Sequence, residues 1–266
     1  MIDYVELKSE NSDANTLLCI HTTPLDKNYF LHNLKNIKLM MNIILIDLPN
    51  HGNSITFKDD EKYNMQDISA EIKKIQDNLN IANIYLLGHG FGGMVAIDYA
   101  TRYHQKVSKL ILVNSSPDSK YREELAWNIR QFYSKVTIQA LDEYRGKTDD
   151  KSIRARFTQA LSTYFHPRSF EEATKLMDLS EKIASKDYVH ISNNILSNLD
   201  YRAKLRSFNG ESLIIFSKND VWPKSASQKL RNDLINAKYI ELDTGHFPMI
   251  EIAEKFWLEI FDFALN

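Results

Sequence analysis

Three segments far apart in this 266-residue chain carry residue types suited to acid–base and acyl-transfer chemistry. The first is the glycine-rich run at 88–93, the second contains Asp220, and the third contains His246. An imidazole titrates near neutral pH and can take a proton from a reacting group. A carboxylate beside it can hold one tautomer and stabilise the charged ring. We therefore ask which elements would bring these segments together.

The glycine-rich run reads Gly88-His89-Gly90-Phe91-Gly92-Gly93 and holds four of the chain's 8 glycines. The apolar residues 84–87 precede it, and residues 94–100 follow with a helical pattern. Glycines allow a sharp turn with close backbone packing. The sequence predicts a strand, a tight elbow and a helix. No Lys-Ser or Lys-Thr follows, and the run comes late in the chain, which excludes a P-loop and a Rossmann fingerprint.

This elbow resembles the nucleophile elbow of the α/β-hydrolases, whose pattern is G-x-S-x-G. Further segments are similar to that family's motifs: His21-Thr22-Thr23-Pro24, Asp47-Leu48-Pro49-Asn50-His51-Gly52-Asn53-Ser54, Phe216-Ser217-Lys218-Asn219-Asp220 and Gly245-His246-Phe247-Pro248. Their order along the chain is elbow, acid, histidine, as the family requires. Only the stretch between residues 118 and 208 has no counterpart among these motifs.

The resemblance implies that His246 is a general base and Asp220 the acid that orients it. Gly90 stands where the family carries its serine. The backbone N–H groups of Phe91 and Thr23 are implied to form the oxyanion hole. The expected substrate pocket contains four further residues: Thr22, Met94, Trp222 and Phe247. Thr22 occupies the position of a glycine that is usual in the family.

Three hypotheses for Gly90 stay open at this point. In the first, glycine has replaced a native serine, and the chain is an inactive form of an enzyme acting on an ester, amide or thioester of a small to medium, partly apolar molecule. In the second, glycine is native, and His246 with Asp220 activates water or takes a proton from carbon, as in a lyase or cyclase. In the third, the chain is a non-catalytic ligand-binding relative that kept the fold.

The remaining pattern indicates an α/β fold. Short continuous apolar runs at 17–20, 43–46, 84–87, 110–113 and 212–216 suit strands of a mostly parallel sheet wrapped by helices, and residues 238–242 are expected to form a further strand. Strand signals are absent between 118 and 208. We therefore expect an α/β-hydrolase core made of residues 1–117 and 209–266, with a helical lid at 118–208.

Within the lid we expect helices at about 121–133, 137–144, 152–164, 170–183 and 188–205, the fourth capped by Ser169. The lid aromatic residues are expected to be mostly helix-packing residues. His89 is expected to pack behind the elbow. The Ser115-Ser116-Pro117 segment predicts a surface turn.

Composition limits the partners. The net charge is −2, from 33 basic and 35 acidic residues, and favours a small-molecule substrate over nucleic acid. No apolar run is long enough to span a membrane, and residues 1–8 do not resemble a signal peptide. The single Cys19 excludes an internal disulfide, and together these features predict a cytoplasmic protein. The 8 histidines show no metal-ligand spacing, so we expect no metal and no cofactor. The oligomeric state is not predicted.

Overall fold

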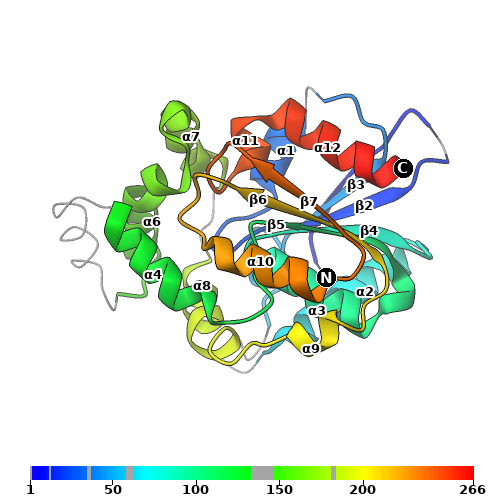
Figure 1. Ribbon diagram of the computed structural model, residues 1–266, viewed down its shortest axis with the longest axis horizontal. Helices are drawn as coiled ribbons and strands as arrows, with labels where there is room; N and C mark the ends of the chain where they lie inside the picture. Colours follow the sequence, from blue (N-terminus) through cyan, green and yellow to red (C-terminus); the bar gives the residue numbers. More distant parts are fainter. Residues whose placement is uncertain (1, 12, 35–36, 58–62, 133–146, 181–183) are drawn as a thin grey trace.

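A seven-stranded sheet crosses the centre of the molecule (Figure 1). This computed structural model describes residues 2–11, 13–34, 37–57, 63–132, 147–180 and 184–266. The strand order is β1-β3-β2-β4-β5-β6-β7. All neighbouring strands run parallel except β1, which is antiparallel to β3. The predicted α/β architecture with a mostly parallel sheet is thereby confirmed.

Apart from β1, the strands form where the sequence predicted them. Their bounds are β1 (Tyr4–Leu7), β2 (Thr16–Ile20), β3 (Asn42–Ile46), β4 (Ile84–His89), β5 (Val107–Val113), β6 (Glu211–Ser217) and β7 (Ala237–Leu242). The central strands are buried on both faces, which explains their continuous apolar sequence. The edge strands β1 and β7 are only partly buried, and our sequence analysis did not identify β1.

Helices cover both faces of the sheet. On one face lie α1 (Asn28–Leu34), α11 (Pro248–Glu251) and α12 (Ala253–Leu265), with a core that includes Trp257 and Phe30. On the other lie α2 (Met65–Asn78), α3 (Phe91–Arg102), α9 (Arg202–Leu205) and α10 (Lys224–Asp233). A short 3-10 turn, η1 (His104–Lys106), leads from α3 into β5. This layered packing fixes the strand ends that carry the candidate site.

Between β5 and β6 the regular elements of the described residues are helices and helical turns, and the β structure there is limited to one isolated bridge, Asp118 to Asp200. The elements are α4 (Tyr121–Phe132), α6 (Asp150–Tyr164), η2 (Pro167–Ser169), α7 (Phe170–Leu179), α8 (Ser185–His190), the π-helical turn η3 (Ile191–Ile195) and α9. We call α4 to α9 the helical insertion. Its first helices gather at one end of the sheet (Figure 1).

Three local predictions in the insertion need comment. The single helix expected at 188–205 is wrong, because the chain forms α8, η3 and α9 with a break between them. Ser169 precedes α7, but its side chain makes no capping hydrogen bond there. The helix expected at 137–144 lies outside the described residues.

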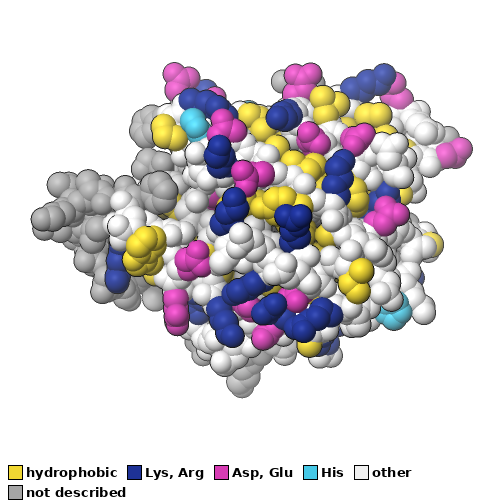
Figure 2. Space-filling view, viewed as in Figure 1, with side chains coloured by type: hydrophobic (Ala, Val, Ile, Leu, Met, Phe, Trp, Pro, Cys, Tyr) yellow, Lys and Arg dark blue, Asp and Glu magenta, His cyan; other side chains and the backbone are white. Residues whose placement is uncertain are grey.

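Acidic and basic side chains are interspersed over the face shown in Figure 2. Where Lys and Arg gather over α9 and α10, several pair with carboxylates: Arg202 lies 2.6 Å from Asp233, and Lys229 lies 3.0 Å from Asp118. Such pairing offsets part of the positive charge there. In the part of the chain that the structure describes, every helix is too short or too polar to cross a membrane.

Candidate active site

The glycine-rich elbow connects β4 to α3. Gly90 has φ +56° and ψ −119°, a backbone conformation that residues other than glycine rarely adopt. Its N–H donates to the Val113 carbonyl oxygen (3.0 Å), and its carbonyl oxygen accepts from Ser115 Oγ (2.8 Å). At Gly92 a Cβ atom would lie 2.4 Å from the His21 carbonyl oxygen, so α3 starts in direct contact with the end of β2. The elbow is therefore fixed on several sides.

Asp220 and His246 come together beside this elbow. Asp220 follows β6, His246 follows β7, and the two strands are neighbours in the sheet. His246 Nδ1 lies 2.6 Å from Asp220 Oδ2, and both residues are buried. The other carboxylate oxygen, Oδ1, accepts the Trp222 backbone N–H at 2.9 Å. This arrangement leaves the opposite ring nitrogen, Nε2, to face the elbow.

The backbone and ring of His246 are held from several directions. Its N–H donates to the Tyr164 carbonyl oxygen at 2.5 Å, and its carbonyl oxygen accepts from Asn114 Nδ2 at 2.9 Å. The Trp222 ring stacks on the imidazole with centroids 5.3 Å apart. Nε2 makes no hydrogen bond to any described residue, which leaves it available to take a proton.

A chain of hydrogen bonds links the elbow region to His246. The Thr22 N–H donates to Tyr29 Oη (3.0 Å), the Tyr29 hydroxyl to His89 Nδ1 (2.9 Å), and His89 Nε2–H to the His246 carbonyl oxygen (2.9 Å). Burial, followed by the nearby His246, holds the pKa of His89 well below its usual value. His89 is thus a neutral residue packed behind the elbow, as expected.

Thr22 lies against Gly90. A Cβ atom placed on Gly90 would be 2.5 Å from Thr22 Oγ1, 3.0 Å from Thr22 Cβ and 3.4 Å from His246 Nε2. The Phe91 N–H, one of the two predicted oxyanion-hole donors, points to Thr22 Oγ1 at 3.3 Å. The Thr22 hydroxyl thus stands at the place where an elbow side chain would begin.

The other predicted donor, Thr23, lies beside His51. Its hydroxyl is 3.0 Å from His51 Nε2, and His51 Nδ1–H donates to the Pro49 carbonyl oxygen. Burial, followed by the nearby His21, lowers the pKa of His51 to about 4. The backbone amide of Thr23 remains a predicted donor.

Asp47 does not line the cavity and instead stabilises the loops beside it. Asp47 Oδ2 lies 2.7 Å from the Lys27 ammonium, and both side chains are buried. Asp47 Oδ1 also accepts the Lys27 backbone N–H at 2.9 Å. This pair ties the end of β3 to the loop after β2, which is the loop that carries Thr22.

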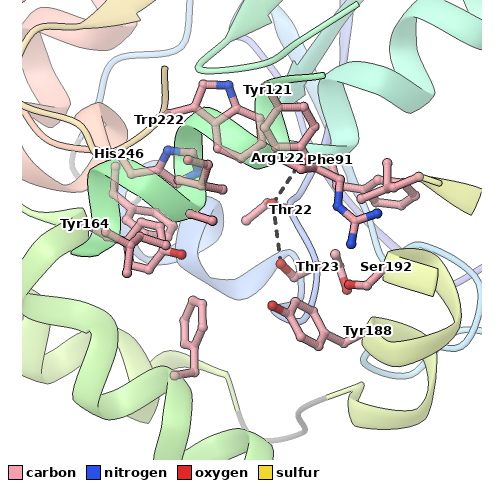
Figure 3. A pocket seen from close by; sticks show the side chains of 16 residues that line it. Thr22, Thr23, Phe91, Tyr121, Arg122, Tyr164, Tyr188, Ser192, Trp222 and His246 are labelled. Atoms are coloured by element: carbon pink, nitrogen blue, oxygen red, sulfur yellow. Dashed lines mark hydrogen bonds between the residues drawn. The ribbon is translucent and has the colours of Figure 1, made fainter. Parts of the chain in front are cut away.

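A cavity of about 200 Å³ lies between the elbow and the helical insertion (Figure 3). The core contributes Thr22, Thr23, Phe91, Trp222, His246 and Phe247 to its lining. The insertion contributes Tyr121, Arg122, Leu125, Ala126, Ile129, Phe157, Tyr164, Tyr188, Ser192 and Leu196. Most of this surface is apolar or aromatic, which suits a partly apolar ligand.

Two sequence predictions are corrected here. Met94 does not line this cavity: it is fully buried on α3, in the core against the sheet. Ser115 and Ser116 are buried rather than in a surface turn, and Ser115 supports the elbow through Gly90. Thr22, Trp222 and Phe247 do line the cavity as expected.

Arg122, Tyr188 and Ser192 were not identified from the sequence. Figure 3 shows Arg122 and Ser192 on the side of the cavity away from Tyr164. An adjoining hollow is lined by Arg122, Arg156, Lys147 and their neighbours. No acidic side chain is among the described residues that line either space. The charged side chains among the described lining residues at this end of the site are therefore all basic.

The described residues contain no group of three or more His, Cys, Asp or Glu side chains that could hold a metal ion. The residues that meet at the cavity are instead a histidine–aspartate pair, a hydroxyl and the elbow amide. Residues 15–252 match the family described as "alpha/beta hydrolase fold". The chain belongs to the α/β-hydrolase fold family.

Several α/β-hydrolases of known name are similar to this chain. Epoxide hydrolase 4 of Mus musculus is 28% identical over 53% of this chain and 41% of its own length. Pimeloyl-[acyl-carrier protein] methyl ester esterase of Vibrio campbellii is 25% identical over 93% of this chain and 94% of its own. The enol-lactonase structure from Burkholderia xenovorans LB400 has a TM-score of 0.77 and 17% identity, and covers 100% of this chain and 96% of that one. This last likeness concerns the fold.

Proposed function

We propose that this α/β-hydrolase is an enzyme that cleaves an ester, amide or thioester of a small to medium, partly apolar molecule. In this proposal His246, oriented by Asp220, is the general base and Gly90 belongs to the working site. The observation that carries it is the free Nε2 of His246, 3.4 Å from where a residue-90 side chain would begin, with Nδ1 bound to Asp220. Relatives include an enzyme named as a methyl ester esterase, which supports the substrate class.

The proposal treats Gly90 as native rather than as the remnant of a serine. A serine Cβ here would approach Thr22 Oγ1 to 2.5 Å and Thr22 Cβ to 3.0 Å. Neither contact is normal for non-bonded atoms, and the Thr22 backbone is held by hydrogen bonds to Tyr29 and from Leu25. Thr22 thus fills the space beside Gly90, which favours a site that works without a nucleophile over a site inactivated by loss of a serine.

The chemistry then requires direct attack by water. His246 Nε2 takes a proton from water while the water oxygen forms a bond to the carbonyl carbon. Negative charge develops on the carbonyl oxygen. When the bond to the leaving group breaks, the imidazolium returns its proton to the departing oxygen, nitrogen or sulfur atom. General base assistance of this kind contributes typically 10²–10⁴-fold to the rate.

We further propose that the helical insertion is a lid, with residues 118–208 as its extent and 1–117 and 209–266 as the core. It supplies most of the lining residues of the cavity, including the aromatic residues Tyr121 and Tyr164. Because it forms one side of the cavity, it suits a role in excluding bulk water from the reacting groups.

The test is a kinetic comparison of the unmodified protein with His246→Ala on a panel of 4-nitrophenyl esters, lactones and aryl thioesters. Asp178→Asn, an exposed substitution on α7, serves as the matched control for handling and folding. We expect turnover by the unmodified protein and the control, and a loss of at least about 100-fold in His246→Ala. Ligand binding without turnover, unchanged by His246→Ala, would instead support a non-catalytic binder and overturn the proposal.

A further inference from the structure

The hydroxyl of Thr22 is built into the site by its surroundings. Thr22 lines the cavity and is only 7% exposed. Its backbone N–H is bound to Tyr29, and its carbonyl oxygen accepts from both His21 Nδ1 (3.0 Å) and the Leu25 N–H (3.2 Å). With the backbone held at both polar atoms, the position of the side chain beside Gly90 follows from the fold.

The hydrogen bonds of this hydroxyl leave its proton available. Oγ1 accepts the Phe91 N–H at 3.3 Å. Among the described residues its only acceptor is the Thr23 carbonyl oxygen, at a long 3.5 Å. The O–H can therefore turn into the cavity and donate to an oxygen of the substrate. Because Phe91 donates to Oγ1, the hydroxyl becomes a stronger donor in turn.

The Thr22 hydroxyl thus lies between the Phe91 N–H and the substrate in a chain of two hydrogen bonds. In the proposed reaction the carbonyl oxygen becomes negative and needs donors placed in advance. The Phe91 N–H already points to Thr22 Oγ1, whose O–H is the next donor along that line. Figure 3 shows Thr22 between His246 and Thr23 in the centre of the lining residues.

We propose that Thr22 is a catalytic residue whose hydroxyl donates a hydrogen bond to the substrate oxyanion, in place of a direct bond from the elbow amide. This inference rests on the proposed function. Water supplies the attacking oxygen, and its proton goes to His246. The hydroxyl is not the nucleophile, because a nucleophile must lie within hydrogen-bond reach of its base, and Thr22 Oγ1 makes no such bond to His246 Nε2.

The test compares Thr22→Ser, which keeps the hydroxyl, with Thr22→Val, which keeps the shape and removes it. Thr101→Val is the matched control, because the hydrogen bonds of Thr101 Oγ1 to described residues stay within α3, to the Ile97 and Asp98 carbonyl oxygens. We expect kcat to fall about 100-fold or more in Thr22→Val, with KM changed by less than about threefold, and to recover in Thr22→Ser. Thr22→Val with an unchanged kcat would overturn the inference.

A binding measurement keeps the inference testable without a known substrate. The probe is the monoanion of phenyl butylphosphonate, a stable tetrahedral mimic, measured by calorimetry. We expect it to bind the unmodified protein and Thr22→Ser, and about tenfold more weakly to Thr22→Val. Equal binding by Thr22→Val, or no binding by the unmodified protein, would contradict the inference.

Two further outcomes separate this inference from the proposed function. Loss of turnover in His246→Ala together with full activity in Thr22→Val leaves the proposed function standing and removes the role of Thr22. An acyl adduct on Thr22, found by mass spectrometry after acid quenching, would show a nucleophile rather than a donor and would also overturn the inference.

Discussion

Asp220 Oδ2 and His246 Nδ1 lie 2.6 Å apart at the ends of neighbouring strands, and both residues are buried. Replacing the carboxylate by an amide keeps the shape but lets the ring take the wrong tautomer. We predict that Asp220→Asn lowers kcat/KM by about 10²–10⁴-fold, with little change in ligand affinity. Steady-state kinetics with Asp178→Asn as control would check this, and a loss below threefold would contradict it.

Gly90→Ser should not by itself create a serine hydrolase. The new Cβ would meet Thr22 Oγ1 at 2.5 Å, so we expect a loss of roughly 1–3 kcal/mol in the free energy of unfolding. In the double variant Gly90→Ser with Thr22→Gly, that contact is removed. We predict that a fluorophosphonate probe labels the double variant much faster than the single one.

Equal labelling of the single and double variants would contradict this prediction, because it would show that the Thr22 side chain moves aside for a serine at residue 90. Gain of esterase activity in Gly90→Ser alone would return the inactive-form hypothesis to first place. The double variant Gly90→Ala with Thr22→Gly is the control for overall folding, because it places a side chain at residue 90 that has no hydroxyl for the probe to label.

Arg122 should favour substrates with an anionic group. It lines the cavity beside Ser192, and no described acidic side chain lines the same space. A charged hydrogen bond contributes about 1.5–3 kcal/mol, so we predict that Arg122→Leu raises KM for 4-nitrophenyl hemiesters by roughly tenfold or more. KM for uncharged 4-nitrophenyl butyrate should change little. Arg130→Leu, an exposed position on the same helix, is the matched control.

Asp26 should make stability depend on pH. Burial raises its pKa from 3.8 to about 6, although Asn28 N–H donates to its carboxylate. The folded state therefore holds the proton more tightly, and stability falls as pH rises from about 4 through 6. We predict that Asp26→Asn stabilises the protein at pH 7.5 by at most about 3 kcal/mol, and much less at pH 4. Urea unfolding at both pH values would measure this, and equal effects at both would contradict it.

The sequence predicted the elements of the fold that repeat a simple pattern. Residues 84–87 formed a strand and Gly90 an elbow because the apolar run and the glycines are local signals. The motif order also predicted the approach of Asp220 to His246. Met94 was misplaced because its position on α3 turns it toward the sheet, which the elbow motif does not specify.

Other features depend on contacts between distant segments. Ser115 was expected at the surface, yet it donates to Gly90 across the ends of β4 and β5. The filling of the Gly90 space by Thr22 requires the distance between two loops, which no local pattern contains. The same holds for Arg122, because helix periodicity alone does not tell which face of α4 meets the cavity.

The bond from the His246 N–H to the Tyr164 carbonyl oxygen has a mechanical consequence. Tyr164 ends α6, so a swing of that helix would drag the imidazole out of line with Asp220. If the product left by displacing α6, the hydrogen bond between His246 and Asp220 would be disturbed at every turnover. The border formed by Arg122 and Ser192 shows no such bond to His246 among the described residues. Substrate entry and product exit past Arg122 and Ser192 would therefore leave the His246–Asp220 pair intact for the next turnover.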